Sequence, residues 1–248
     1  MVKAVSTEKA ILVLFGGMFL LAGLVSQVSI LRIFLLIVIQ FLVFIGPGMA
    51  IQTLLGIRHI DRLSLFFSSY IVGYSIAVLA YLVLLLCGYP KLILAYAVLM
   101  LISCFFLRNK LIDEISATGK SDRSLVRKVA IIFVCAFLVG FIFYQLPNLS
   151  ALQVGYWSSQ TDSFYYMKCC LGATKEFPLP DYSYSSTQIY WHVFSCLGLA
   201  LQKILSGIEM ADIVFRLSYI MHVFMLLSSL YTLARLIIKN NTYIVYIL

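Results

Sequence analysis

Charged residues are scarce in this sequence. Asp, Glu, Lys and Arg make up 11% of the 248 residues, hydrophobic residues make up 62%, and the mean hydropathy is +1.02. A soluble domain carries about 25% charged residues and about 45–50% apolar ones. This composition excludes an ordinary soluble domain and predicts a protein that lies in a lipid bilayer.

Alternating polarity is also missing. Strands of a membrane barrel alternate apolar and polar residues over about ten positions, whereas this chain runs in unbroken apolar blocks such as 71–86 and 130–143. Every backbone group inside lipid needs an internal partner, so helices are the structure that is left. The predicted fold class is all-α, a polytopic transmembrane helical bundle.

Several functional motifs are absent as well. The sequence has no GxxxxGK[ST], HExxH or GxSxG segment, which argues against an ATP-driven pump and against common hydrolases. Its six cysteines lack metal-binding spacing, and the neighbours Cys169 and Cys170 make a poor disulfide with each other. The net charge of +8 comes from Lys and Arg scattered at the ends of apolar blocks, a pattern that sets membrane topology. We expect no nucleic-acid partner.

Seven apolar blocks are long enough to predict membrane spans, since a span needs about 20 residues: 9–26, 29–55, 64–87, 91–107, 128–146, 188–206 and 211–238. An eighth block is cut short at 243–248, so we expect an N-terminal fragment of a longer protein. Gly46-Pro47-Gly48 predicts a kink or break in the second span.

The loop charges predict an orientation. Residues 108–128 hold six Lys or Arg, whereas 147–187 hold only Lys168 and Lys175 against three acidic residues. Positive loops stay in the cytoplasm, so we expect the N-terminus inside and loop 147–187 outside a plasma (inner) membrane. Counting seven spans puts Arg235 on the outer side, against the rule. Either a snorkelling side chain or a miscounted sixth span would explain this.

The loop over 147–187 is long for a membrane protein and rich in aromatic residues. From Asp162 to about Lys175 its pattern predicts a short juxtamembrane helix, capped by Thr161 or Asp162 and ended by the prolines that follow. The residues expected to share its apolar face are Phe164, Met167, Cys170 and Leu171. A helix of this kind lies in the membrane interface.

Polar groups in and near this loop are the candidate functional residues. Asp162 could act as a general base or as a ligand of a divalent metal ion; the alternative is a plain helix cap. His192 could contact a phosphate or belong to an interfacial aromatic belt. Arg216 lies within the seventh span, where Asp212 four residues earlier predicts a structural ion pair near its cytoplasmic end.

The order of short motifs after residue 128 carries a resemblance. The segments are Thr161-Asp162-Ser163-Phe164, Lys175-Glu176-Phe177-Pro178, Tyr190-Trp191-His192, Leu205-Ser206-Gly207, Phe215-Arg216-Leu217-Ser218 and Leu230-Tyr231-Thr232-Leu233-Ala234-Arg235. This order resembles membrane-embedded glycosyltransferases of the GT-C fold, the superfamily of dolichyl-phosphate-mannose protein mannosyltransferases. The resemblance covers about 128–238 and divides the chain into N-terminal helices with a basic cytoplasmic loop (1–127) and a GT-C-like region (128–248).

The resemblance implies a function. The chain would transfer a sugar from a polyprenyl-phosphate donor to an acceptor on the extracytoplasmic face. Asp162 would match the family's loop aspartate, which serves as catalytic base or metal ligand. The substrate-binding candidates are Lys168, Tyr190, Trp191 and His192. Ser163 departs from the family, because many members have a second acidic residue at that position.

A non-enzymatic membrane protein, such as a transporter, flippase or assembly subunit, is the alternative. A transporter should contain paired inverted repeats with broken helices, and the single Gly-Pro-Gly segment has no counterpart in the sequence. An enzyme resembling O-antigen polymerases would also use a large outer loop, but we would expect that loop to contain more arginine.

Overall fold

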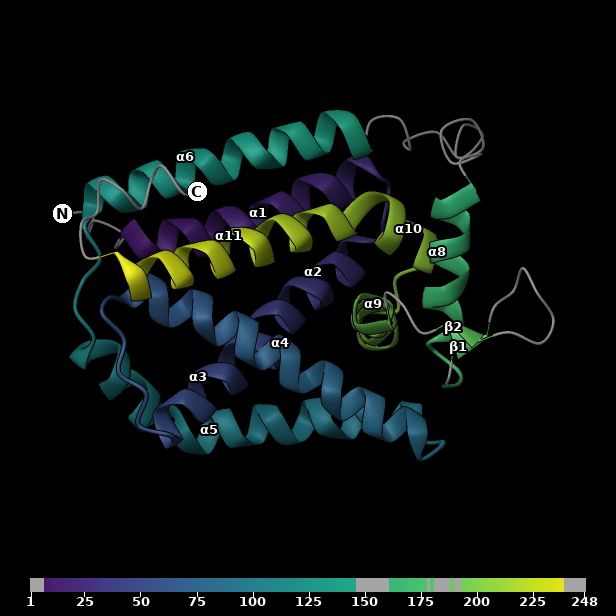
Figure 1. Ribbon diagram of the computed structural model, residues 1–248, viewed down its shortest axis with the longest axis horizontal. Helices are drawn as coiled ribbons and strands as arrows, with labels where there is room; N and C mark the ends of the chain where they lie inside the picture. Colours follow the sequence, from purple (N-terminus) through teal and green to yellow (C-terminus); the bar gives the residue numbers. More distant parts are fainter. Residues whose placement is uncertain (1–6, 146–160, 178, 181–187, 190–192, 239–248) are drawn as a thin grey trace.

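The apolar blocks fold into helices in a computed structural model of the chain, which describes residues 7–145, 161–177, 179–180, 188–189 and 193–238 (Figure 1). The α-helices are α1 (Thr7–Val25), α2 (Ile30–Val38), α3 (Gly46–Leu54), α4 (Arg62–Leu86), α5 (Ile93–Ala117), α6 (Arg123–Gly140), α8 (Thr161–Gly172), α9 (Val193–Ser206), α10 (Met210–Asp212) and α11 (Ser218–Ile237). The all-α multi-pass fold class is thus confirmed.

Five continuous helical stretches in the described part are long and apolar enough to cross a membrane: Ile30–Leu54, Arg62–Leu86, Pro90–Ala117, Arg123–Phe143 and Met210–Ile237. The other two predicted spans form shorter apolar helices, Lys9–Val25 and Phe194–Ser206. The block at 243–248, predicted as a truncated eighth span, lies outside the described residues.

Three helical stretches widen into π-helix: η1 (Ile39–Ile45), η3 (Phe141–Gln145) and η5 (Ile213–Leu217). The first explains why the helix does not break at Gly46-Pro47-Gly48, where the sequence predicted a kink or break. Proline lacks an N–H and its ring clashes with the carbonyl four residues earlier in an α-helix. Because Gly46 N–H instead bonds to Phe41 O, five residues back, the helix widens just before Pro47 and runs on to Leu54.

The basic segment at 108–128, predicted as a loop, is mostly helical. Its residues extend the end of α5 to Ala117 and the start of α6 from Arg123, so the connection is only 118–122. This connection holds the start of α4, since Arg62 N–H donates to Gly119 O at 3.0 Å and Leu63 N–H to Ser121 Oγ at 3.0 Å. We call this end of the bundle the basic end, and the opposite end the α8 end.

Aromatic rings join the helices in the core. The rings of Phe15 in α1 and Phe224 in α11 stack with centroids 3.8 Å apart, while Phe67 and Tyr70 of α4 meet Phe224 edge-on. Phe133 of α6 completes the cluster. All five side chains are at most 2% exposed, so helices from both halves of the sequence share one core.

Short helices cover the α8 end. Figure 1 shows α1, α6 and α11 lengthwise, α8 across their ends and α9 viewed along its axis. α9 has 14 residues, which span about 21 Å at about 1.5 Å per residue, less than the membrane's hydrocarbon core of about 30 Å. The predicted sixth span is therefore helical from Val193 but does not run alongside the long helices.

Candidate functional site

The juxtamembrane helix predicted within the outer loop is present as α8, and side chains of other elements fasten it. The Tyr81 hydroxyl at the end of α4 donates to Ala173 O at 2.6 Å. Cys169, Cys170 and Ala173 are at most 3% exposed, and α8 packs against α9 and α10. The predicted apolar face is partly wrong, because Leu171 is 39% exposed.

Buried side chains line the contact of α8 with α9. Cys170 of α8 and Cys196 of α9 are 0% and 1% exposed, and Tyr166 of α8 packs against the same core. Burial raises the pKa of Tyr166 above its ordinary value, so the phenol stays protonated at neutral pH and serves as a structural contact.

Buried amides hold α9 in the bundle. The Tyr70 hydroxyl donates to Gln40 Oε1 at 2.9 Å, and Gln40 Nε2 donates to Gln202 Oε1 of α9 at 3.4 Å. Both glutamines are fully buried. A polar side chain in an apolar interior needs such partners, so this network fixes the position of α9 and, through it, that of α8.

The two β-strands lie between α8 and α9. β1 (Leu179–Pro180) and β2 (Gln188–Ile189) pair antiparallel, with Leu179 opposite Ile189. They bring the two ends of the segment after α8 together. Nothing in the sequence pattern predicted this pairing, because two residues are too few for an alternating signal.

The predicted site residues fall in different places. Asp162 stands in the first turn of α8, and its side chain is outside what the structure describes. Tyr190, Trp191 and His192 also lie outside the described residues. Lys168 is exposed on α8, six residues and thus about 240° around the helix from Asp162, so the two do not share a helix face.

The predicted ion pair between Asp212 and Arg216 is confirmed. Arg216 Nη1 lies 2.5 Å from Asp212 Oδ1, and both side chains are largely buried. Arg216 also donates to Ser26 O, just beyond the end of α1, at 3.5 Å. This contact puts the pair at the α8 end, opposite the basic end that the loop charges predict to be cytoplasmic.

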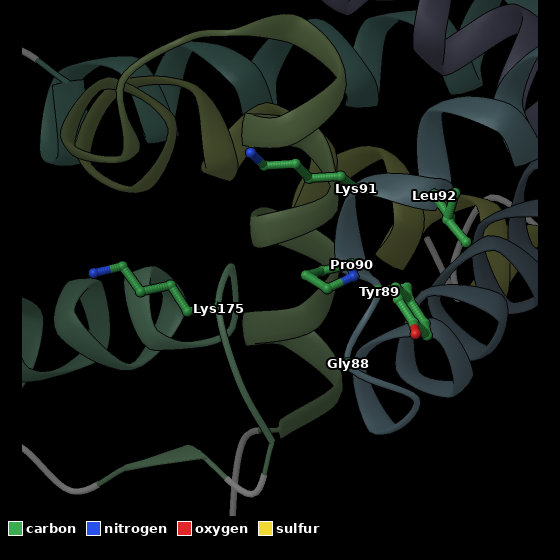
Figure 2. Close-up of a pocket in the computed structure, with 6 residues that line it drawn as sticks. All are labelled: Gly88, Tyr89, Pro90, Lys91, Leu92 and Lys175. Carbon is green, nitrogen blue, oxygen red and sulfur yellow. The ribbon is translucent and has the colours of Figure 1, made fainter.

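A groove of about 410 Å³ lies beside the α4–α5 turn, lined by Gly88, Tyr89, Pro90, Lys91, Leu92 and Lys175 (Figure 2). Pro90 opens the short η2 helix (Pro90–Leu92), and Lys175 follows α8. Figure 2 shows that the two lysine side chains extend in the same direction without their ammonium groups meeting. They therefore do not converge on one anion.

This groove is also far from Asp162. Asp162 lies ten residues before Gly172, the end of α8, which is about 15 Å at about 1.5 Å per residue, and Lys175 follows three residues later. Reacting atoms must come within about 3–3.5 Å of each other. A phosphate held at Lys175 is therefore too distant to take part in a reaction at Asp162.

The described residues were compared with the ligand sets that a metal ion requires. Within the ranges that the structure describes, no three His, Cys, Asp or Glu side chains gather as a metal site requires. Asp212 ends α10, the element in contact with α8, and its partner Arg216 lies on η5, directly after α10. The sequence named both residues but could not show that the element of Asp212 packs against α8.

No family model, no curated protein and no solved structure matches this chain. The resemblance to GT-C glycosyltransferases thus rests on the sequence motifs alone.

Proposed function

We propose that this multi-pass membrane protein is a glycosyltransferase that moves a sugar from a polyprenyl-phosphate donor to an acceptor on the extracytoplasmic face. The observation that carries the proposal is the contact of α8 with α10. It brings the helix that begins at Thr161-Asp162 against the element that directly precedes the motif segment with Arg216, about 50 residues later in the sequence.

The proposed reaction assigns these residues separate roles. The Asp162 carboxylate accepts the proton of an acceptor hydroxyl, whose oxygen attacks the anomeric carbon of the donor sugar. The bond from that carbon to the phosphate oxygen breaks, and polyprenyl phosphate leaves. Negative charge develops on this phosphate, and we assign the Arg216 guanidinium to it, because arginine matches phosphate oxygens well.

Among the described residues no three His, Cys, Asp or Glu side chains gather, and the side chain of Asp162, the possible metal ligand, lies outside them. Lys168, the cation that the sequence suggested, is less suited to the phosphate because it stands on a different helix face from Asp162. The distribution of charge supports a reaction on the outer face of the membrane. Clustered positive charge marks the cytoplasmic side, and the α8 end, which carries Asp162, is opposite the basic end.

The transporter alternative finds less support. Transporter sites use helices that unwind in mid-membrane. In the described part, the one segment that predicted such a break is helical at every residue from Ile30 to Leu54. We therefore keep the enzyme as the proposal.

Replacing Asp162 by Asn tests the proposed glycosyltransferase activity. The general base is lost while size and helix-capping ability are kept, so transfer from a lipid-linked sugar should fall by about 10²-fold or more. The measurement is sugar transfer by the purified chain in proteoliposomes that contain donor and acceptor. Glu176→Gln is the matched control, because this exposed carboxylate lies just beyond α8 and its loss should leave transfer unchanged. An Asp162→Asn variant that inserts normally and transfers at the original rate would refute the assignment.

A further inference from the structure

A second groove, of about 250 Å³, runs along α6 near the basic end. The residues that line it are Arg127, Ala130, Ile131, Val134 and Cys135. The last four follow Arg127 at intervals of three, four, seven and eight positions, which is the spacing of one helix face. Apart from the guanidinium of Arg127, the lining is apolar. We call this feature the α6 groove.

The α6 groove opens to the outside of the bundle. Figure 1 shows α6 along the edge of the bundle. Ile131 is 53% exposed, whereas Val129 and Phe133, on the core-facing side of α6, are at most 2% exposed. The helical stretch Arg123–Phe143 is long and apolar enough to cross a membrane, so the medium around the groove is lipid. From Arg127 to Cys135 the helix rises about 12 Å at about 1.5 Å per residue. The groove therefore leads from the membrane surface into the hydrocarbon region.

Arg127 has no counterion in the protein. Two other arginines near the basic end are engaged by it: Arg235 Nε donates to Asp61 at 2.7 Å, and Arg62 Nε donates to Ile115 O at 2.8 Å. No ion pair of Arg127 exists within the part of the chain that the structure describes. Its guanidinium is therefore available to an anion from outside the chain.

Further positive charge stands beside Arg127. Arg123 lies one helical turn earlier and Lys128 is the next residue, and all three are exposed. Helical side chains lean toward the N-terminus of their helix, so these cations extend toward the membrane surface at the basic end. Basic side chains in this position attract lipids with negative headgroups. Arginine in particular binds phosphate oxygens in a bidentate way.

We propose that the α6 groove binds an anionic phospholipid. The Arg127 guanidinium holds the lipid phosphate, and an acyl chain lies along Ile131, Val134 and Cys135. Arg123 and Lys128 select for net negative charge, because the cation of a zwitterionic headgroup would lie among them and be repelled. The proposal requires neither glycosyltransferase activity nor a particular orientation of the chain, since the orientation decides only which leaflet supplies the lipid.

Lipid titration tests the proposal. The full chain, purified in mild detergent, is titrated with phosphatidylglycerol or phosphatidylcholine of the same acyl chains, and native mass spectrometry measures the binding of the first lipid. We expect phosphatidylglycerol to bind about tenfold more tightly or better. Equal affinities for the two lipids would overturn the proposal.

The acyl chain has its own arm in this experiment. Glycerol 3-phosphate carries the phosphate without the hydrocarbon and should not displace phosphatidylglycerol, because it leaves the apolar lining empty. Displacement by glycerol 3-phosphate would show a site for free phosphates and would refute the lipid assignment.

Two variants that remove the same charge distinguish a site from general attraction. Arg127→Gln should reduce the preference for phosphatidylglycerol to about twofold or less. Lys110→Gln is the matched control, because Lys110 is an exposed cation near the end of α5 and does not line the α6 groove. It should retain the preference. An equal loss in both variants would mean that total charge alone attracts the lipid, and the proposal would fail.

Photo-crosslinking locates the lipid on the unmodified chain, so the test does not depend on the folding of a variant. Phosphatidylglycerol with a diazirine in its acyl chain is bound and irradiated, and the labelled peptides are mapped by mass spectrometry. Labelling should concentrate on the peptide that contains residues 131–135. The comparison surface is the apolar face of α5, where Val98, Ile102 and Phe105 are also exposed. Equal labelling of both surfaces would show ordinary surrounding lipid and would overturn the proposal.

Discussion

Asp61 has several structural roles at the basic end, and each depends on its burial. Its Oδ1 accepts the Ser64 N–H at 2.8 Å, which caps the start of α4. Its Oδ2 accepts the Tyr231 hydroxyl at 3.1 Å and Arg235 Nε at 2.7 Å. The side chain is 2% exposed and that of Arg235 is 10% exposed. A carboxylate with so little water depends on these partners for its charge.

Replacing Asp61 by Asn should destabilise the protein by about 3 kcal/mol or more, because the Arg235 charge is left buried without its counterion. The measurement is the free energy of unfolding in a titration from mild detergent into SDS. Glu209→Gln is the control. It breaks the Lys203–Glu209 pair, in which Glu209 is 69% exposed, and such pairs contribute about 0–1 kcal/mol.

Removing both charges distinguishes the ion pair from the helix cap. Adding Arg235→Met to Asp61→Asn should restore part of the lost stability, since no unpaired charge stays buried. Equal stability of Asp61→Asn and the unsubstituted chain would contradict the assigned role of Asp61.

For pairs of residues, the distance between them in the sequence determines which contacts could be predicted. Asp212 and Arg216 are one helical turn apart, and their pairing was predicted and is confirmed at 2.5 Å. Asp61 and Arg235 are 174 residues apart, and the pattern of charges gave no reason to join them. The same holds for Gln40 with Gln202, because each contact depends on how distant helices pack.

At the scale of helices, α4 crosses the stretch formed by η1 and α3 at close range. A Cβ added to Gly48 would lie 1.8 Å from Ser69 O, and one added to Gly73 would lie 1.8 Å from Phe44 O. The two backbones therefore touch directly, as at the small-residue interfaces of membrane helices. Gly48 belongs to the segment that predicted a helix break, and its actual role is to allow this contact.

Replacing Gly73 by Ala should destabilise the protein by about 2–3 kcal/mol, because the new methyl group meets a backbone carbonyl that cannot move without separating the helices. Thermal unfolding in detergent measures the effect. Gly17→Ala in α1 is the control, since a Cβ there has nothing within 4 Å, and it should be neutral or stabilise by less than about 1 kcal/mol. Similar melting curves for the two variants would rule out the tight crossing.

The sequence pattern of the juxtamembrane helix predicted that the helix exists but not which of its faces is buried. Its existence followed from a capping residue at 161–162 and from prolines after residue 177, and α8 begins at Thr161. Its buried face was only partly right. Leu171 was assigned to it but is 39% exposed, whereas Cys169 and Ala173 are buried. The buried face depends on where α9 and α10 lie, which the helix's own sequence does not contain.

For the whole molecule, one short helix changes the topology. The apolar block at 188–206 was counted as a span, which put Arg235 on the side opposite the basic end. In the structure α9 lies across the long helices (Figure 1), so after α6 one long helix, the stretch Met210–Ile237, returns. Arg235 therefore reaches Asp61 at the basic end. If α9 does not cross the membrane, the miscounted sixth span, one of two explanations considered from the sequence, accounts for the discord.

This arrangement collects positive charge at one end. The basic residues toward the basic end are Arg58, Arg62, Arg108, Lys110, Lys120, Arg123, Arg127, Lys128 and Arg235. Apolar block lengths predicted the long helices at 30–54, 62–86 and 90–117, and the orientation from loop charges stays a prediction. They failed at α9 because hydropathy measures how apolar a helix is and not its direction in the membrane.

Cysteine labelling tests the topology directly. Lys120→Cys, Lys175→Cys and Lys239→Cys are made singly in a chain whose exposed cysteines, Cys87 and Cys135, are replaced by Ser. A membrane-impermeant maleimide on intact cells should label Lys175→Cys alone, because the other two positions belong to the proposed cytoplasmic end.

Opening the membranes should then expose Lys120→Cys and Lys239→Cys together, since the contact of Arg235 with Asp61 ties the end of α11 to the connection at 118–122. A count of seven spans requires the opposite result, with Lys239→Cys labelled in intact cells alongside Lys175→Cys. That outcome would mean that α9 crosses the membrane. It would also separate Arg235 from the buried carboxylate that holds the basic end together.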